Sequence, residues 1–163
     1  MNKDDILSRY RQNDGETACS IITPKLVKGQ ELSDEQKEMV ASLDELLKSS
    51  SPCEREMVVY RGCRLDEFRD GEPYRAFIST SLEIFEALRF CQGCLVKIVV
   101  PKGTQILKVS PERSETSSLE RGEYLLTRGL RFKIKSWSLS EEEILHVGFC
   151  SYDGVTFNEL VIP

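Results

Sequence analysis

The stretch AFISTSL, residues 76–82, places three small hydroxyl side chains directly after an aromatic and a β-branched residue. We predict a strand that ends here, because the apolar start suits a half-buried strand. Alternation along the strand sends Ser79 and Ser81 to one face and Thr80 to the other. Taken alone, the stretch is also typical of a strand end that leads into a helix near Leu82, with one hydroxyl capping that helix. The segments that accompany it separate these two interpretations.

Three further segments accompany this stretch, and each joins a charged side chain to an apolar run. They are VVYRG (58–62), ALRF (87–90) and RGEYLLTRG (121–129), the last followed by the alternating LRFKI (130–134). In order and spacing they resemble the mono-ADP-ribosyltransferases of the arginine–serine–glutamate class, the cholera-toxin-like and C3-like enzymes. The resemblance runs from about Leu43 to the C-terminus. It implies a bacterial toxin or effector catalytic domain that transfers ADP-ribose from NAD⁺ to a target.

The composition of the chain limits its class. Its 163 residues fit one domain with one core, and 40% apolar and 30% charged residues are ordinary for a soluble globular protein. The net charge of -5 argues against a general nucleic-acid binder, which needs a basic face to displace counterions from phosphate. No apolar run reaches the length of a membrane span, and the start, MNKDD, lacks the order of a signal peptide. We expect a soluble protein of the bacterial cytoplasm, or an effector secreted into a host cytosol.

The cysteines do not form a metal-binding pattern. Of the six, at positions 19, 53, 63, 91, 94 and 150, only those of CQGC (91–94) are closely spaced. A structural zinc site would need a second close pair of ligands, and the single histidine, His146, does not supply one. We therefore expect no metal, and reduced cysteines that pack as small apolar side chains.

The order of the predicted elements indicates an α+β fold. Helices are predicted over residues 4–11 and 33–49, the second opened by a capping box of Ser33 and Gln36. Residues 19–27 are predicted to be irregular or a short helical turn, because Pro24 interrupts them. Strands are predicted over residues 57–60, 76–80, 95–100, 105–109, 124–126, 131–138, 144–150 and 155–161.

This order corresponds to a single domain, residues 1–163, with a helical front (1–52) and a β-rich, NAD⁺-binding core (53–163). The resembled family has N-terminal helices followed by two packed, mostly antiparallel sheets, with an NAD⁺-binding cleft between the sheets. We expect the same architecture here.

The chemistry needs a carboxylate, because breaking the bond between nicotinamide and ribose builds positive charge on the anomeric carbon. Glu123, followed by two leucines and an Arg-Gly turn, is the candidate. The resemblance implies that it bonds the 2′-hydroxyl of the nicotinamide ribose and that Ser79 holds it in orientation. A rival, Glu143 in EEEIL (141–145), lacks this context and is interpreted as part of a solvated acidic cluster at a turn.

Cofactor-binding side chains are expected around the same point. The Arg61 guanidinium offers a planar set of donors that matches phosphate oxygens, and Gly62 would let the cofactor approach the backbone. The alternative for Arg61 is a surface or ion-paired arginine at a strand end. Thr80 and Ser81 would shape the wall of the cleft. Phe90 would lie beside the nicotinamide, although packing in the core is the favoured alternative for this residue.

The acceptor is the point at which the chain departs from the resembled family. Arginine-directed members carry a second glutamate two positions before the catalytic one, and here that position is Arg121. Its charge would repel a guanidinium, so we expect a neutral acceptor, a Ser or Thr hydroxyl or an amide, on a target protein such as a host regulatory protein. Glu120 could compensate if the chain bulges. The polar stretch before it, residues 110–118, has the place of the family's target-recognition loop.

Two other functions stay open. An NAD⁺ glycohydrolase would use water in place of the acceptor and release ADP-ribose without marking a macromolecule. A catalytically inactive NAD⁺- or protein-binding module would need none of the catalytic groups, and the presence of Arg61, Ser79 and Glu123 together argues against it.

Overall fold

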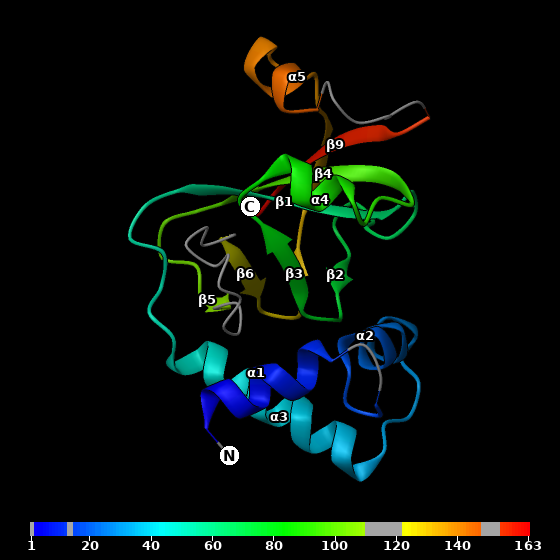
Figure 1. Cartoon of the computed structure of the whole chain (residues 1–163), viewed down its shortest axis with the longest axis vertical. Coiled ribbons are helices and arrows are strands. Elements are labelled where there is room, and N and C mark those ends of the chain that lie inside the picture. Colours follow the sequence, from blue (N-terminus) through cyan, green and yellow to red (C-terminus); the bar gives the residue numbers. More distant parts are fainter. Residues whose placement is uncertain (1, 13–14, 110–121, 148–153) are drawn as a thin grey trace.

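The computed structural model describes residues 2–12, 15–109, 122–147 and 154–163 (Figure 1). The helices are α1 Lys3–Arg11, α2 Cys19–Lys28, α3 Asp34–Ser49, α4 Ile84–Leu88 and α5 Glu141–Val147. The strands are β1 Met57–Arg64, β2 Pro73–Tyr74, β3 Ile78–Ser81, β4 Gly93–Val100, β5 Ile106–Val109, β6 Glu123–Leu126, β7 Leu130–Arg131, β8 Lys133–Ser136 and β9 Thr156–Val161. None of the described helices has the length and apolar character that crossing a membrane requires.

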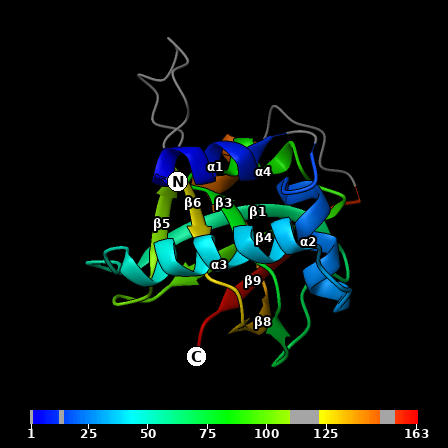
Figure 2. The same ribbon diagram turned by 90° about the horizontal axis from the view of Figure 1, so that it is seen from below.

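The three N-terminal helices pack together at one end of the molecule (Figures 1 and 2). Helix α3 begins as predicted, because the Ser33 hydroxyl accepts from the Gln36 amide at 3.2 Å while the Gln36 side chain accepts from the Ser33 amide at 2.9 Å. Residues 19–27 were predicted to be irregular or a short helical turn, and they form a longer helix, because α2 continues through Pro24 for 10 residues. The fully buried Ile22 packs against α1 and α3, and this burial offsets the backbone hydrogen bond that proline removes.

The large sheet has seven strands in the order β5-β6-β3-β1-β4-β9-β8, and only the β4–β9 pair is parallel. Strands β1 and β3 are paired at a single position, Tyr60 with Ser81, whereas β1 pairs with β4 from Met57 to Arg64. The sheet therefore divides into two halves, whose strands run across each other in Figure 1. A second, two-stranded sheet joins β2 to β7. This arrangement confirms the predicted α+β fold with mostly antiparallel sheets.

Three apolar clusters cover these two halves. The largest lies between β1, β4 and β9 on one side and β3 and β6 on the other, and includes Val59, Ile98, Leu160, Ile78 and Leu126. The second joins the three N-terminal helices to β5, β6 and Phe77, the residue before β3, and the third joins α4 and α5 to β4. Different clusters therefore pack against the sheet on either side of the β1–β3 junction.

The predicted strand over residues 144–150 is wrong, because residues 141–147 form helix α5; residues 148–150 lie outside the described part of the chain. The helix begins with a second capping box, in which the Ser140 hydroxyl accepts from the Glu143 amide at 3.1 Å and Glu143 Oε1 accepts from the Ser140 amide at 2.9 Å. The predicted strand over residues 131–138 is also divided, into the end of β7 and all of β8.

Two cysteines face each other across the β1–β4 ladder. Cys63 and Cys94 are directly paired and are 4% and 2% exposed. The hydrogen bond between the two thiols, together with burial, raises the pKa of Cys63. Side chains of this kind pack as small apolar groups in the core between the two halves. The described residues contain no group of three or more His, Cys, Asp or Glu side chains that could hold a metal.

The sheet packs closely against the end of α4 at Gly62, and this contact generates the first prediction. A Cβ at this position would lie 2.5 Å from the Cys91 amide nitrogen and 2.7 Å from the Phe90 carbonyl carbon, both backbone atoms of the segment that ends α4. Because backbone cannot move aside as a flexible side chain can, Gly62→Ala should lower the free energy of unfolding by about 3 kcal/mol, measured by chemical denaturation.

Gly129→Ala is the matched control. Gly129 has a φ of 85°, but a Cβ there would meet nothing within 4 Å. This substitution should therefore show only the cost of the left-handed backbone, about 1 kcal/mol. Equal losses of unfolding free energy in the two variants would show that the contact with the end of α4 does not restrict which side chain fits at position 62.

Candidate functional site

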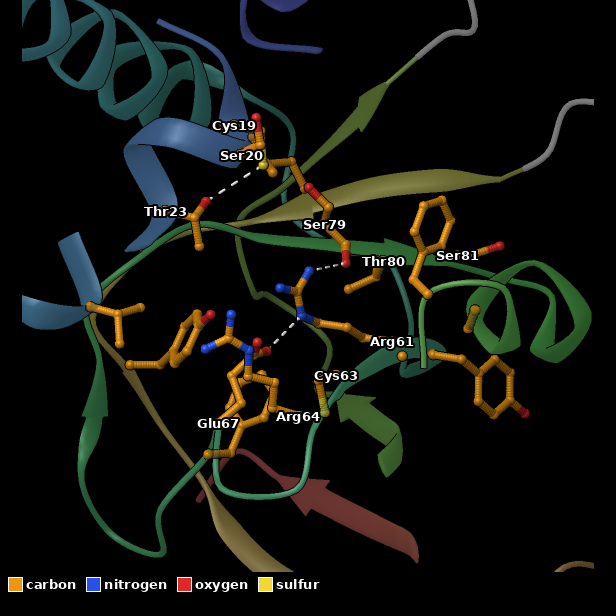
Figure 3. Close-up of a pocket in the computed structure, with 18 of the residues that line it drawn as sticks. Cys19, Ser20, Thr23, Arg61, Cys63, Arg64, Glu67, Ser79, Thr80 and Ser81 are labelled. Carbon is orange, nitrogen blue, oxygen red and sulfur yellow. Dashed lines mark hydrogen bonds and ion pairs between the residues drawn. The ribbon is translucent and has the colours of Figure 1, made fainter. Parts of the chain in front are cut away.

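A cleft of about 1260 Å³ opens between helices α1 and α2 and the point where the two halves of the sheet part (Figure 3). It is lined by side chains from α1, α2, β1, β3, β6 and the end of α4. Every described residue that the sequence singled out as catalytic or cofactor-binding lines this one cleft: Arg61, Gly62, Ser79, Thr80, Ser81, Phe90 and Glu123. Glu120 and Arg121, the predicted acceptor-recognition residues, lie outside the described residues.

Arg61 is held from two sides (Figure 3). Its Nε donates to Glu67 Oε2 at 3.0 Å, and its Nη1 donates to the Ser79 carbonyl at 3.1 Å. Burial by itself lowers the pKa of this guanidinium, but the adjacent Glu67 carboxylate raises it, with a net rise. Arg61 is therefore an ion-paired arginine, as the alternative interpretation expected, and it also lies in the cleft. With the side chain only 17% exposed, it is a fixed cation.

Tyr74 and Tyr10 form the apolar surroundings of this cation. Both are nearly fully buried. Burial raises the pKa of Tyr74 to about 12, although the nearby Arg61 acts to lower it. Burial also raises the pKa of Tyr10. Both phenols are neutral at physiological pH, so they add no charge beside Arg61 and Glu67.

The three hydroxyls of the STS stretch have different environments. The Thr80 hydroxyl donates to the Tyr124 carbonyl at 2.8 Å, which ties β3 to β6. The Ser81 hydroxyl accepts from the Glu83 amide at 3.1 Å, at the turn that leads into α4. Thr80 and Ser81 are buried, whereas Ser79 is exposed in the cleft. Of the three side chains, that of Ser79 is the one most open to a ligand.

Glu123 opens β6 and stands directly opposite Ser81 in the β3–β6 register, while Ser79 stands opposite Leu125. Ser79 is thus a diagonal neighbour of Glu123, a separation of about 7–8 Å between the two Cα atoms in such a ladder. Among the described residues, the side chain in hydrogen-bond contact with Glu123 is that of Arg11, whose Nη2 donates to Glu123 Oε2 at 2.8 Å. The orienting role of Ser79 stays a prediction.

Arg11 is one of the residues that sequence reasoning missed, and Glu67 is another. Arg11 is the last residue of α1, where a basic side chain is already explained by the helix dipole, and it is 112 positions from Glu123. Both side chains are 34% exposed. An ion pair this open to solvent is worth roughly 0–1 kcal/mol, so it orients Glu123 without locking the carboxylate.

Gly122 sets the position of Glu123. Its φ is 57°, and a Cβ there would lie 2.5 Å from the Leu82 side chain. The Leu82 amide also donates to the Gly122 carbonyl at 3.0 Å. The residue before Glu123 is thus packed against the residue that follows Ser81, and this contact explains the glycine in the RGEYLL segment.

One sequence-based interpretation needs correction and another stays a prediction. The space where a Gly62 side chain would stand is occupied by the backbone at the end of α4. Gly62 also lines the cleft, and its part in cofactor binding stays a prediction. Phe90 is 68% exposed, so the expectation that it packs in the core is wrong. It lines the cleft, because it follows the end of the short helix α4 and is not part of the third apolar cluster.

The rival glutamate, Glu143, is a structural residue rather than a freely solvated one. In addition to the capping box, its Oε1 accepts from Trp137 Nε1 at 3.3 Å, and its Oε2 lies 3.8 Å from Lys97 Nζ. Burial acts to raise the pKa of this carboxyl, but its bonds to Ser140 and Trp137 and the charge of Lys97 give a net lowering. Glu143 does not line the cleft.

The sequence matches no protein-family model and no curated protein. The fold, in contrast, matches solved structures over nearly the whole chain. Exoenzyme S from Pseudomonas aeruginosa, solved in complex with human 14-3-3 protein beta and carba-NAD, has a TM-score of 0.64 at 20% identity. The match covers 88% of this chain and 66% of that one, so this chain spans just under two thirds of the exoenzyme S chain.

Two further solved structures are similar over a larger share of their own chains. C3larvin toxin, an ADP-ribosyltransferase from Paenibacillus larvae, has a TM-score of 0.67 at 18% identity, over 99% of this chain and 94% of that one. C3stau2 from S. aureus, solved with NAD, has a TM-score of 0.66 at 18% identity, over 98% and 85%. The chain therefore has the fold of the bacterial C3-like and exoenzyme S-like ADP-ribosyltransferase toxins.

Proposed function

We propose that this protein is an NAD⁺-dependent mono-ADP-ribosyltransferase that transfers ADP-ribose to a neutral side chain of a target protein and releases nicotinamide. The observation that carries the proposal is the meeting of Arg61, Ser79 and Glu123 in one cleft, although 62 residues separate the first from the last. Proteins of the same fold were solved with NAD or carba-NAD, which supports NAD⁺ as the substrate.

The roles follow from the chemistry of each group. Arg61, fixed by Glu67, presents its remaining donors to the pyrophosphate, and its planar guanidinium suits phosphate oxygens. Glu123 bonds the 2′-hydroxyl of the nicotinamide ribose and stabilises the positive charge that develops as the glycosidic bond breaks. The exposed Ser79 hydroxyl lies on the same strand face as Glu123 and orients it when the cofactor binds.

Thr80 and Ser81 shape the wall beside Glu123, and Phe90 at the border of the cleft covers the nicotinamide end. We further propose that residues 1–163 act as one catalytic domain. The helical front contributes to the site itself, because Arg11 of α1 contacts Glu123 of β6.

For the acceptor, the proposal is a Ser or Thr hydroxyl or a side-chain amide on a host protein. Arg121, two residues before Glu123 in the sequence, would repel a cationic acceptor. The protein carrying the acceptor is to be found by incubating the full chain with labelled NAD⁺ and a cell lysate. Labelled protein supports the transferase, whereas release of free ADP-ribose without any labelled macromolecule would identify a glycohydrolase.

Glu123→Gln should reduce transfer by about 100-fold or more while the fold and NAD⁺ binding persist, because the amide keeps the shape but loses the charge. Transfer to lysate protein and NAD⁺ affinity are measured on the same preparation. The matched control is Glu143→Gln, which leaves the cleft intact and keeps a side chain that can serve a capping box. A larger loss from Glu143→Gln than from Glu123→Gln would contradict the assignment of the carboxylate.

Arg61→Ala should act through cofactor affinity. Because its guanidinium is proposed to contact phosphate in the ground and transition states alike, the KM for NAD⁺ should rise about tenfold, at least as clearly as kcat falls. Initial rates across an NAD⁺ series separate the two constants, with thermal unfolding as a check on the fold. Finding the KM unchanged in a folded variant would remove Arg61 from the cofactor site.

The linkage to the target protein should identify the acceptor. Mass spectrometry of labelled peptides should place ADP-ribose on serine, threonine, asparagine or glutamine, and the bond should survive neutral hydroxylamine treatment that cleaves arginine linkages. Arg121→Glu should weaken transfer to this target at least tenfold. Efficient labelling of arginine side chains by the wild-type protein would overturn the proposed acceptor.

A further inference from the structure

The contact between Arg11 and Glu123 is a guanidinium already bound to the candidate catalytic carboxylate. Arg11 Nη2 lies 2.8 Å from Glu123 Oε2, and both residues line the cleft. The guanidinium comes from the end of α1, an element that the sequence did not connect with catalysis. We propose that Arg11 is a specificity-determining residue that excludes cationic acceptors by occupying and neutralising Glu123. This inference rests on the proposed function. It adds Arg11 to Arg121 as a residue that determines which acceptor is modified.

Two physical effects give this result. A cationic acceptor such as an arginine side chain must be attracted by a carboxylate near the reacting carbon, and a carboxylate paired with Arg11 offers little net charge to attract it. Arg11 is also a competitor within the same molecule. Its effective concentration at Glu123 is on the order of millimolar or higher. An external guanidinium at a lower concentration therefore competes poorly for the Glu123 carboxylate.

A neutral acceptor is not excluded in this way. A hydroxyl, an amide or water needs no net negative charge for its approach. Arg11 bonds Oε2 of Glu123, so the ribose 2′-hydroxyl can bond Oε1 while Arg11 stays in place. Arg11 selects between acceptors by their charge, and it does not prevent cleavage of NAD⁺.

The test compares agmatine, a free guanidinium acceptor, with water as acceptor in the full chain. The ratio of ADP-ribosyl-agmatine formed to ADP-ribose released is measured for the wild type, Arg11→Gln and Arg11→Lys. Arg11→Gln removes the charge and should raise this ratio about threefold to fivefold, the most that an ion pair of about 1 kcal/mol allows. Arg11→Lys keeps the charge and should stay within about 1.5-fold of the wild type.

The matched control is Arg89→Gln. Arg89 also lines the cleft and also pairs with a carboxylate, Glu86 at 3.3 Å, but it is not in contact with Glu123. Its substitution should leave the ratio unchanged. Thermal unfolding of all variants verifies that they are folded, which is expected because Arg11 is an exposed residue at a helix end.

Three results would overturn the inference while leaving the proposed function intact. One is NAD⁺ cleavage by Arg11→Gln with no rise in the agmatine ratio. Another is an equal rise in Arg11→Lys, which would show that charge is not the cause, and the third is an equal rise in Arg89→Gln. If the wild type releases no nicotinamide from NAD⁺ with any acceptor, the proposed function fails and this inference fails with it.

Discussion

The site depends on the short pairing between β1 and β3. The two strands share the single pair Tyr60 and Ser81, and beyond it the halves of the sheet separate. A parted sheet leaves backbone groups without ladder partners, and these groups take other partners. The Arg61 side chain donates to one of them, the Ser79 carbonyl, across the opening. The same side chain that lines the cleft therefore also stabilises the separation that forms it.

The two ion pairs of the cleft differ in rigidity, and the difference suits two tasks. Arg61 and Glu67 are 17% and 18% exposed, so their attraction is only weakly screened and the guanidinium is held in one place. Arg11 and Glu123 are each 34% exposed, so their contact is more strongly screened and exchanges more easily. Under the proposed function, a guanidinium that binds phosphate benefits from a fixed position, whereas a carboxylate that bonds a sugar hydroxyl needs freedom to adjust.

Helix α4 connects the two ends of the site, although it has only five residues. The backbone that ends it fills the space beside Gly62, next to Arg61. The residue that precedes its first turn, Leu82, packs on Gly122, next to Glu123. Both glycines are therefore needed for close packing of the chain around α4. The relative position of Arg61 and Glu123 follows from these two contacts.

The sequence by itself determined those features that follow from local patterns. Helix α3 and its capping box, the alternation of the STS hydroxyls and most of the strands were predicted correctly, because apolar period and capping residues act within a few positions. The residues that line the cleft were also found from their segments, Arg61, Ser79 and Glu123 among them.

Only the tertiary structure decided the rest, and the reason is that the deciding contacts join distant parts of the chain. Helix α2 persists through Pro24 because Ile22 is buried between other helices. Residues 141–147 form a helix because Ser140 and Glu143 cap it and Val147 packs with α4 and Trp137, although their β-branched residues predicted a strand. The partner of Glu123 could not be inferred at all, since Arg11 is 112 positions away and only the packing of α1 on the sheet brings the two charges together.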